Sequence, residues 1–154
     1  MTIDDQYTDM LARRGARDRV AEKDRLRLIV DATRRGLTHR VISESLGTVS
    51  QATITRLIQR VDNDPYLTRE TPAEVIDRCA AGEIDPAQMM DKLINWRYDF
   101  GRIPTVNGHD TDAYVTGDWD QVERAYYRGL LTDAQFQVLA DRQNDILERQ
   151  SRQR

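Results

Sequence analysis

The feature of the sequence that most restricts its fold is Gly47, which separates two short helical patterns. The first pattern begins at Thr38 and runs to about Ser45; the second begins at Ser50. Ser and Thr cap helix N-termini, because their side-chain oxygens accept hydrogen bonds from the first unpaired N–H groups. Glycine adopts the left-handed conformation of a tight turn without steric cost. The segment therefore predicts two short helices joined by a turn at Gly47.

Two helices can cross closely only where small residues lie at the contact. Ser43 is the small residue expected at the contact on the first helix, and Ala52 on the second. The apolar residues expected to form the shared core are Ile42, Leu46, Ile54 and Leu57. Together with the Gly47 turn, these residues predict a helix-turn-helix.

The remainder of the chain also predicts helices. Thr71-Pro72 and Asp85-Pro86 each place a capping residue before a proline, with Glu74 and Gln88 completing capping boxes. We expect one further helix capped by Asp118 and another starting at Thr132. Aromatic residues make up 6% of the sequence, and runs of Val and Ile typical of strands are almost absent. The predicted fold is all-α, with a short hairpin as one interpretation of residues 98–117.

The predicted domains are a helix-turn-helix domain and a second small helical domain. We expect an N-terminal arm over residues 1–16, which is either a weak helix or mobile, the first domain over 17–62, a linker over 63–70 and the second domain over 71–154. Gly36 fits the position that ends the helix before the motif. Pro65 follows Asp62-Asn63-Asp64 and cannot continue a helix.

Charge is distributed unevenly along the chain. Residues 10–61 hold twelve Arg and Lys against five Asp and Glu, whereas residues 62–154 hold eleven basic and eighteen acidic residues. The overall net charge is −3. A basic segment joined to an acidic one indicates that the basic segment faces a polyanion.

The helix after Ser50 carries side chains suited to nucleic-acid contacts. Gln and Arg present paired groups that match the adenine and guanine edges in the major groove, and Thr reaches phosphate or a thymine methyl. Nearby arginines supply sequence-independent attraction to phosphates. The predicted DNA-binding residues of the first domain are Arg34, Arg35, Arg40, Thr48, Ser50, Gln51, Thr53, Thr55, Arg56 and Arg60. The turn is one residue longer than usual, which leaves the register of the second helix open. Arg13, Arg14 and Arg17 suit either a minor-groove arm or a solvated helix end.

The chain resembles the immunity repressors of temperate mycobacteriophages, which also bind dispersed stoperator sites. The resemblance runs from about Asp18 to Gln143. Its motifs are GLTHRVISESLG (36–47), SQATITR (50–56), TPAE (71–74), LINWRY (93–98) and AYYRGLLT (125–132). It implies a repressor of early lytic promoters that maintains lysogeny and superinfection immunity. It also implies a monomer whose second domain touches DNA within a long asymmetric site. In the acidic half, one cluster suits such contacts: Asn95, Arg97, Tyr98 and Arg102. For Tyr98 the alternative is packing in the core, and for Trp96 core packing is the favoured role.

Two other function classes remain open. A small DNA-binding subunit of a phage packaging machine would use the last helix, with Phe136, Leu139 and Ile146, for ring assembly; an intramolecular core explains that stripe as well. A DNA-modifying or recombination enzyme is disfavoured, since the sequence contains no recognisable nucleophile or metal constellation.

The remaining signals indicate no additional chemistry. Cys79 is the one cysteine, and His39 and His109 have no partners at metal-ligand spacing. We therefore expect no enzymatic activity, no cofactor, no metal and no small-molecule substrate. No apolar run reaches the ~20 residues of a membrane span, and the acidic, polar start does not resemble a signal peptide. The expected location is the cytoplasm of a bacterial host.

Overall fold

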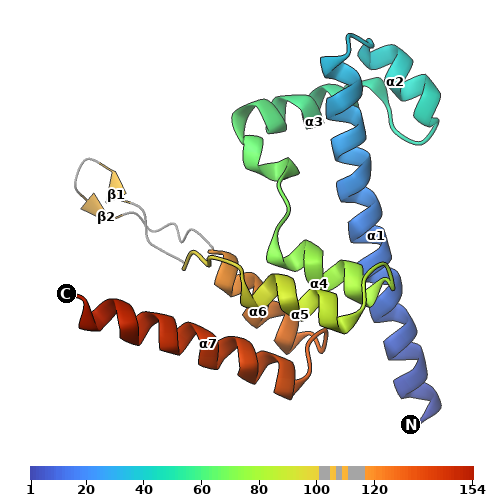
Figure 1. Ribbon diagram of the computed structural model, residues 1–154. Helices are drawn as coiled ribbons and strands as arrows, with labels where there is room; N and C mark the ends of the chain where they lie inside the picture. Colours follow the sequence, from blue (N-terminus) through green and yellow to red (C-terminus); the bar gives the residue numbers. More distant parts are fainter. Residues whose placement is uncertain (101–104, 107–108, 111–116) are drawn as a thin grey trace. The chain divides into compact units, whose positions relative to one another are not determined.

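The regular secondary structure of the described residues is almost entirely helical. The computed structural model describes residues 1–100, 105–106, 109–110 and 117–154. Within these ranges it contains seven α-helices, one short 3₁₀-helix and one pair of two-residue strands (Figure 1). The prediction of an all-α fold is thereby confirmed. The elements are α1 (Ile3–Arg34), α2 (His39–Leu46), α3 (Gln51–Asn63), η1 (Pro65–Thr68), α4 (Pro72–Ala80), α5 (Pro86–Ile94), β1 (Thr105–Val106), β2 (His109–Asp110), α6 (Asp118–Tyr127) and α7 (Asp133–Arg152).

The helices fall into two compact units. The central unit comprises Asp18–Glu70, and the terminal unit comprises Met1–Arg17 together with Thr71–Arg154. Helix α1 contributes residues to both. Strands β1 and β2 pair antiparallel, with Thr105 opposite Asp110, so the hairpin interpretation of this region is confirmed for the four residues described.

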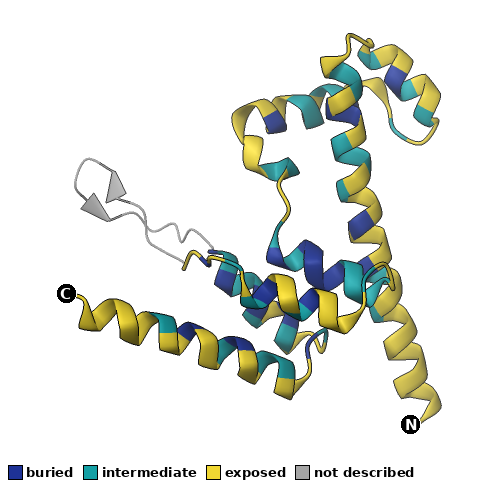
Figure 2. Ribbon diagram, viewed as in Figure 1, coloured by how far each residue is buried: buried dark blue, intermediate teal, exposed yellow. Residues whose placement is uncertain are grey.

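The central unit has a small apolar core. Ile29 of α1, Ile42 of α2 and Ile54 of α3 are its buried members. The predicted core residues Leu46 and Leu57 pack against them as partly buried side chains. The predicted shared core is confirmed, with the last turns of α1 as an additional wall. In Figure 2 most of α2 and α3 is exposed or half-buried, and the buried residues are Ile42 on α2 and Ile54 and Val61 on α3.

Of the two alternatives for residues 1–16, the helix is confirmed, because Ile3 to Ala16 belong to the first half of α1. Thr2 and Asp5 form a reciprocal cap: the Thr2 hydroxyl oxygen accepts from the Asp5 N–H at 3.1 Å, and Asp5 Oδ2 accepts from the Thr2 N–H at 3.0 Å. The Thr2 N–H and the Thr2 hydroxyl both donate to the Asp5 carboxylate and lower its pKa. A helix start at Thr2 explains why the helix extends through residues whose apolar periodicity is poor. Arg13 pairs with Asp9 at 3.5 Å on the surface of this helix.

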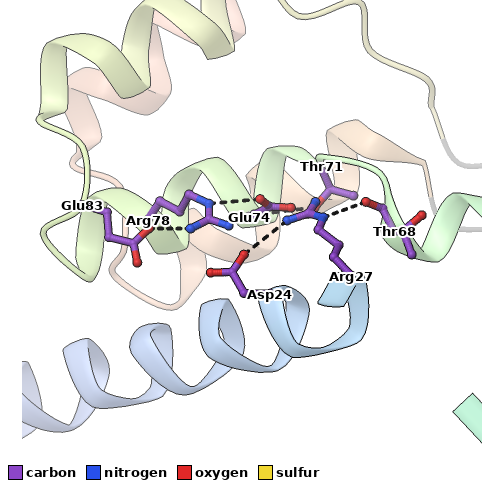
Figure 3. A network of polar contacts seen from close by, with 7 residues as sticks. All are labelled: Asp24, Arg27, Thr68, Thr71, Glu74, Arg78 and Glu83. Carbon is purple, nitrogen blue, oxygen red and sulfur yellow. Dashed lines mark hydrogen bonds and ion pairs between the residues drawn. The ribbon is translucent and has the colours of Figure 1, made fainter. Parts of the chain in front are cut away.

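The linker expected over residues 63–70 belongs to the central unit. Helix α3 includes Asn63, and η1 follows after Asp64, whose Oδ1 accepts from the Tyr66 N–H at 3.2 Å. Arg27 of α1 donates to the Thr68 carbonyl at 2.9 Å and lies 3.6 Å from Asp24 (Figure 3). The segment is therefore ordered and is bonded to α1 through Arg27.

The helix starts of the terminal unit follow the predicted caps, with two corrections. Asp85 with Gln88 and Thr132 with Gln135 form complete capping boxes. Thr71 caps α4 as predicted. The carboxylate of Glu74, which was predicted to complete a capping box with Thr71, lies 3.0 Å from the Arg78 guanidinium, and Arg78 also pairs with Glu83 (Figure 3). The N-cap of α6 is Gly117 and not Asp118, because the Asp120 carboxylate accepts from the Gly117 N–H at 2.9 Å.

The core of the terminal unit is larger and carries aromatic residues. Trp119 of α6 stacks on Phe136 of α7 with ring centroids 6.0 Å apart, and Tyr98 meets the Trp119 ring edge-on at 5.1 Å. Phe136 also stacks on Tyr126 at 4.3 Å. Cys79 and Trp96 pack against this core as partly buried side chains. The favoured packing role of Trp96 is confirmed.

Candidate nucleic-acid interface

The turn between α2 and α3 is fixed by hydrogen bonds on both sides of Gly47. Gly47 has φ 70° and its N–H donates to the Ser43 carbonyl at 3.0 Å. Thr38 accepts from the Val41 N–H, and Ser50 accepts from the Thr53 N–H at 3.2 Å, so both predicted caps are confirmed. The extended turn Gly47–Ser50 therefore sets the first helical residue of α3 as Gln51.

Ser43 contributes a hydrogen bond as well as small size. Its hydroxyl donates to the Val49 carbonyl at 2.6 Å, which ties α2 to the far side of the turn. Ala52, expected at the same helix crossing, is exposed. The expectation for Ala52 is wrong, because Ile54, Leu57, Ile58 and Val61 occupy the inward side of α3 and position 52 lies opposite them.

Ser43→Ala is expected to weaken the central unit by about 1 kcal/mol, since it leaves the half-buried Val49 carbonyl without this donor. Ser45→Ala is the matched control, because Ser45 is exposed on the same helix. Both tryptophans lie in the terminal unit, so hydrogen exchange of the α2 and α3 amides is the suitable measurement. Equal protection in the two variants would contradict the role of the Ser43 hydroxyl.

The outward face of α3 is a ridge of residues at helical spacing. Ala52, Arg56, Gln59 and Asn63 recur at intervals of three and four residues, and all four are exposed. We call these four residues the α3 ridge. Gln51 is also exposed at the first turn. Gln59 was absent from the predicted site, although counting helical positions from the Ser50 cap places it beside Arg56.

The first-turn threonines are engaged within the protein. Thr53 Oγ1 accepts from the Arg56 guanidinium at 3.2 Å and lies 2.9 Å from the Ser50 hydroxyl. Thr55 lies 2.9 Å from His39 of α2 and donates to the Gln51 carbonyl at 3.1 Å. Thr53 therefore orients Arg56 along the helix surface, and Thr55 ties α3 to α2. Both are half-buried.

The predicted phosphate-contacting arginines fall into two groups. Arg34 and Arg40 are exposed, as is Arg35, which lies 3.3 Å from Asp31 one turn earlier. Arg60 is exposed but lines a small cavity of about 80 Å³ that Glu22 and Leu67 also line, so it lies toward α1. From residue 34 to residue 60 the sequence has five arginines and one acidic residue, Glu44. Basic residues therefore outnumber acidic ones five to one between residues 34 and 60, whereas the whole central unit carries ten basic and eight acidic residues.

The candidate cluster of the terminal unit is only partly exposed. Tyr98 is 8% exposed, and its hydroxyl donates to the Leu93 carbonyl at 2.7 Å. Burial, followed by the nearby Asp118 carboxylate, raises the pKa of this hydroxyl. The prediction of Tyr98 as a surface contact is therefore replaced by a packing role. Asn95 and Arg97 are exposed, and Arg102 lies outside the described residues.

Other site types gain no support from the described part of the chain. No group of three or more His, Cys, Asp or Glu side chains there is arranged to hold a metal ion. Nor does any helix there combine the length and apolar character needed to cross a bilayer.

Comparison with known proteins gave no relative: no protein-family model, no curated protein and no solved structure matches the chain.

Proposed function

We propose that the chain binds double-stranded DNA sequence-specifically, with α2 and α3 acting as a helix-turn-helix and α3 entering the major groove. The observation that supports this most is the α3 ridge. These residues lie on the exposed side of α3. The opposite side of α3 packs against Ile29 and Ile42, so the helix that carries the ridge is held in place by the core. A recognition helix requires this combination of a fixed inner face and an exposed polar outer face.

The side chains suit the two kinds of contact that such binding requires. Gln51, Arg56 and Gln59 can form paired hydrogen bonds to base edges, and the Ala52 methyl can lie against a thymine methyl. The exposed arginines Arg34, Arg35 and Arg40 suit phosphate contacts, which position a protein without reading sequence. The charge between residues 34 and 60 supports the assignment of phosphates to this side of the unit.

The biological role follows from the resemblance to mycobacteriophage immunity repressors. On that basis the protein blocks early promoters, maintains lysogeny and binds dispersed sites as a monomer. Asn95 and Arg97 are the described residues through which the terminal unit would add contacts.

Selection of duplexes from a random-sequence pool by the full chain tests sequence-specific binding. We expect enrichment of one motif, bound about 10³-fold or more tighter than unselected duplex at the same salt concentration. Recovery of unrelated sequences that bind no better than the starting pool would reject specific recognition.

A small packaging subunit is the alternative function, and α7 is the element that bears on it. Leu139 is 1% exposed and Phe136 stacks within the terminal unit, so most of the predicted assembly stripe is covered by its own fold. Val138 and Leu147 remain about half exposed. Light scattering separates the two functions: the repressor proposal expects the mass of one chain, and a stable ring of many chains would favour packaging.

A further inference from the structure

A histidine joins the first residue of α2 to the recognition helix proposed above. His39 Nδ1 lies 2.9 Å from Thr55 Oγ1, and both side chains are half-buried. This contact crosses between the two helices close to the first turn of α3. The Nδ1 edge of the ring is therefore bound to Thr55, while the half-buried side chain keeps some contact with solvent.

The hydrogen bonds of Thr55 determine which ring nitrogen carries the proton. Its hydroxyl donates to the Gln51 carbonyl at 3.1 Å, so its oxygen is left to accept. With the hydroxyl proton placed toward Gln51, His39 Nδ1 is the donor of the contact to Thr55, because a hydroxyl has a single proton to give. In the neutral ring this leaves Nε2 as an unprotonated acceptor. The assignment follows from the hydrogen-bond partners.

We infer that His39 is a proton-linked DNA-binding residue, whose Nε2 takes up a proton and donates it to a DNA phosphate oxygen. This inference rests on the proposed function. A phosphate oxygen accepts hydrogen bonds and cannot donate them, so an unprotonated Nε2 has nothing to offer it. Protonation changes Nε2 into a charged donor and leaves the Nδ1 bond to Thr55 intact. The ring can therefore gain a phosphate contact without disturbing α3.

The surroundings favour an anionic partner. One helical turn from His39 on α2 lie Ile42 and Ser43, and one turn from Thr55 on α3 lie Gln51 and Gln59, none of them charged. The charged residues of the adjoining segments are Asp31 and Arg34 on α1, Arg35 just after α1, Arg40 and Glu44 on α2, and Arg56 on α3. Positive charge predominates in this set. A charged ring is therefore favoured most when phosphate lies against it.

The sign of the pH dependence follows from linkage. DNA binds the protonated ring better, so the complex retains this proton to a higher pH than the free protein does. Affinity should therefore rise as the pH falls. One linked proton limits the change to about tenfold per pH unit. We expect DNA binding about three- to tenfold tighter at pH 6 than at pH 8.

Fluorescence anisotropy with a selected duplex, at constant salt and several pH values, tests the inference. His39→Asn is the informative variant, because its amide NH₂ can replace Nδ1–H toward Thr55 but the side chain does not titrate. We expect pH-independent binding for His39→Asn, and an unchanged pH dependence for the control His109→Gln. The same pH dependence in His39→Asn as in the unaltered chain would overturn the inference.

A direct spectroscopic measurement does not depend on any variant. Imidazole ¹⁵N shifts of the full chain, recorded at pH 7.5 with and without duplex, report the charge of the His39 ring. We expect the duplex to raise the fraction of doubly protonated His39 rings. A ring that stays neutral in a stable complex rejects the inference alone, whereas absence of any specific complex rejects the proposed function with it.

Discussion

Arg56→Ala is expected to weaken binding to a selected duplex by about 1–3 kcal/mol, equivalent to about 5- to 150-fold in Kd. Arg56 is exposed on the α3 ridge and is oriented by Thr53, so its guanidinium is available for a two-pronged contact with a guanine edge. Gln51→Ala should cause a loss in the same range, with specificity relaxed at a different base pair.

Arg56→Lys provides the matched control for this prediction. Lysine keeps the positive charge but lacks the planar fork of donors that matches guanine. We expect it to retain most of the affinity for unselected DNA and to lose discrimination at one base pair. Competition binding against single-base variants of the duplex measures both effects. Unchanged discrimination in both Arg56 variants and in Gln51→Ala would reject base contacts by these residues.

Ile54→Ala is expected to destabilise the central unit by about 2–5 kcal/mol. Ile54 is fully buried, and it is one of only three buried residues in the described core cluster of that unit. Domains of this size have small total stability, so the loss would leave a substantial fraction unfolded. DNA affinity should fall as the unfolded fraction rises, because the position of the α3 ridge depends on this core.

Hydrogen exchange of the α2 and α3 amides measures the effect of Ile54→Ala directly. Leu28→Ala is the control, since Leu28 lies in the same unit and is 61% exposed. We expect near-complete loss of slow exchange in Ile54→Ala and a change of no more than about 0.5 kcal/mol in Leu28→Ala. Comparable protection in the two variants would show that the small core does not hold these helices.

Local capping rules predicted much of the fold. The helices after Thr38, Ser50, Thr71, Asp85 and Thr132 begin where the sequence indicates, because each cap depends on residues three positions apart. The starts of α1 and α6 were predicted wrongly, because their caps were not identified from the sequence. Thr2 with Asp5 caps α1 ahead of a weak apolar pattern, and Gly117 caps α6 through the side chain of Asp120.

The candidate site was less predictable, because it depends on which side of each helix is covered. The sequence identifies Thr55 and Tyr98 as polar contacts, but tertiary packing commits Thr55 to His39 and Tyr98 to the Leu93 carbonyl. The exposed position of Gln59 follows from helical geometry once the start of α3 is known. Partners distant in sequence, such as His39 and Thr55, have no local signature.

Amide chemical-shift mapping of the full chain with a selected duplex tests the central claim most directly. If α3 enters the major groove, the largest shift changes should fall between Thr48 and Asn63, with further changes at Arg34, Arg35 and Arg40. Residues facing the core of the terminal unit, such as Leu139, should change little. Large changes confined to α4–α7, with α2 and α3 unaffected, would contradict the proposal that α3 reads DNA.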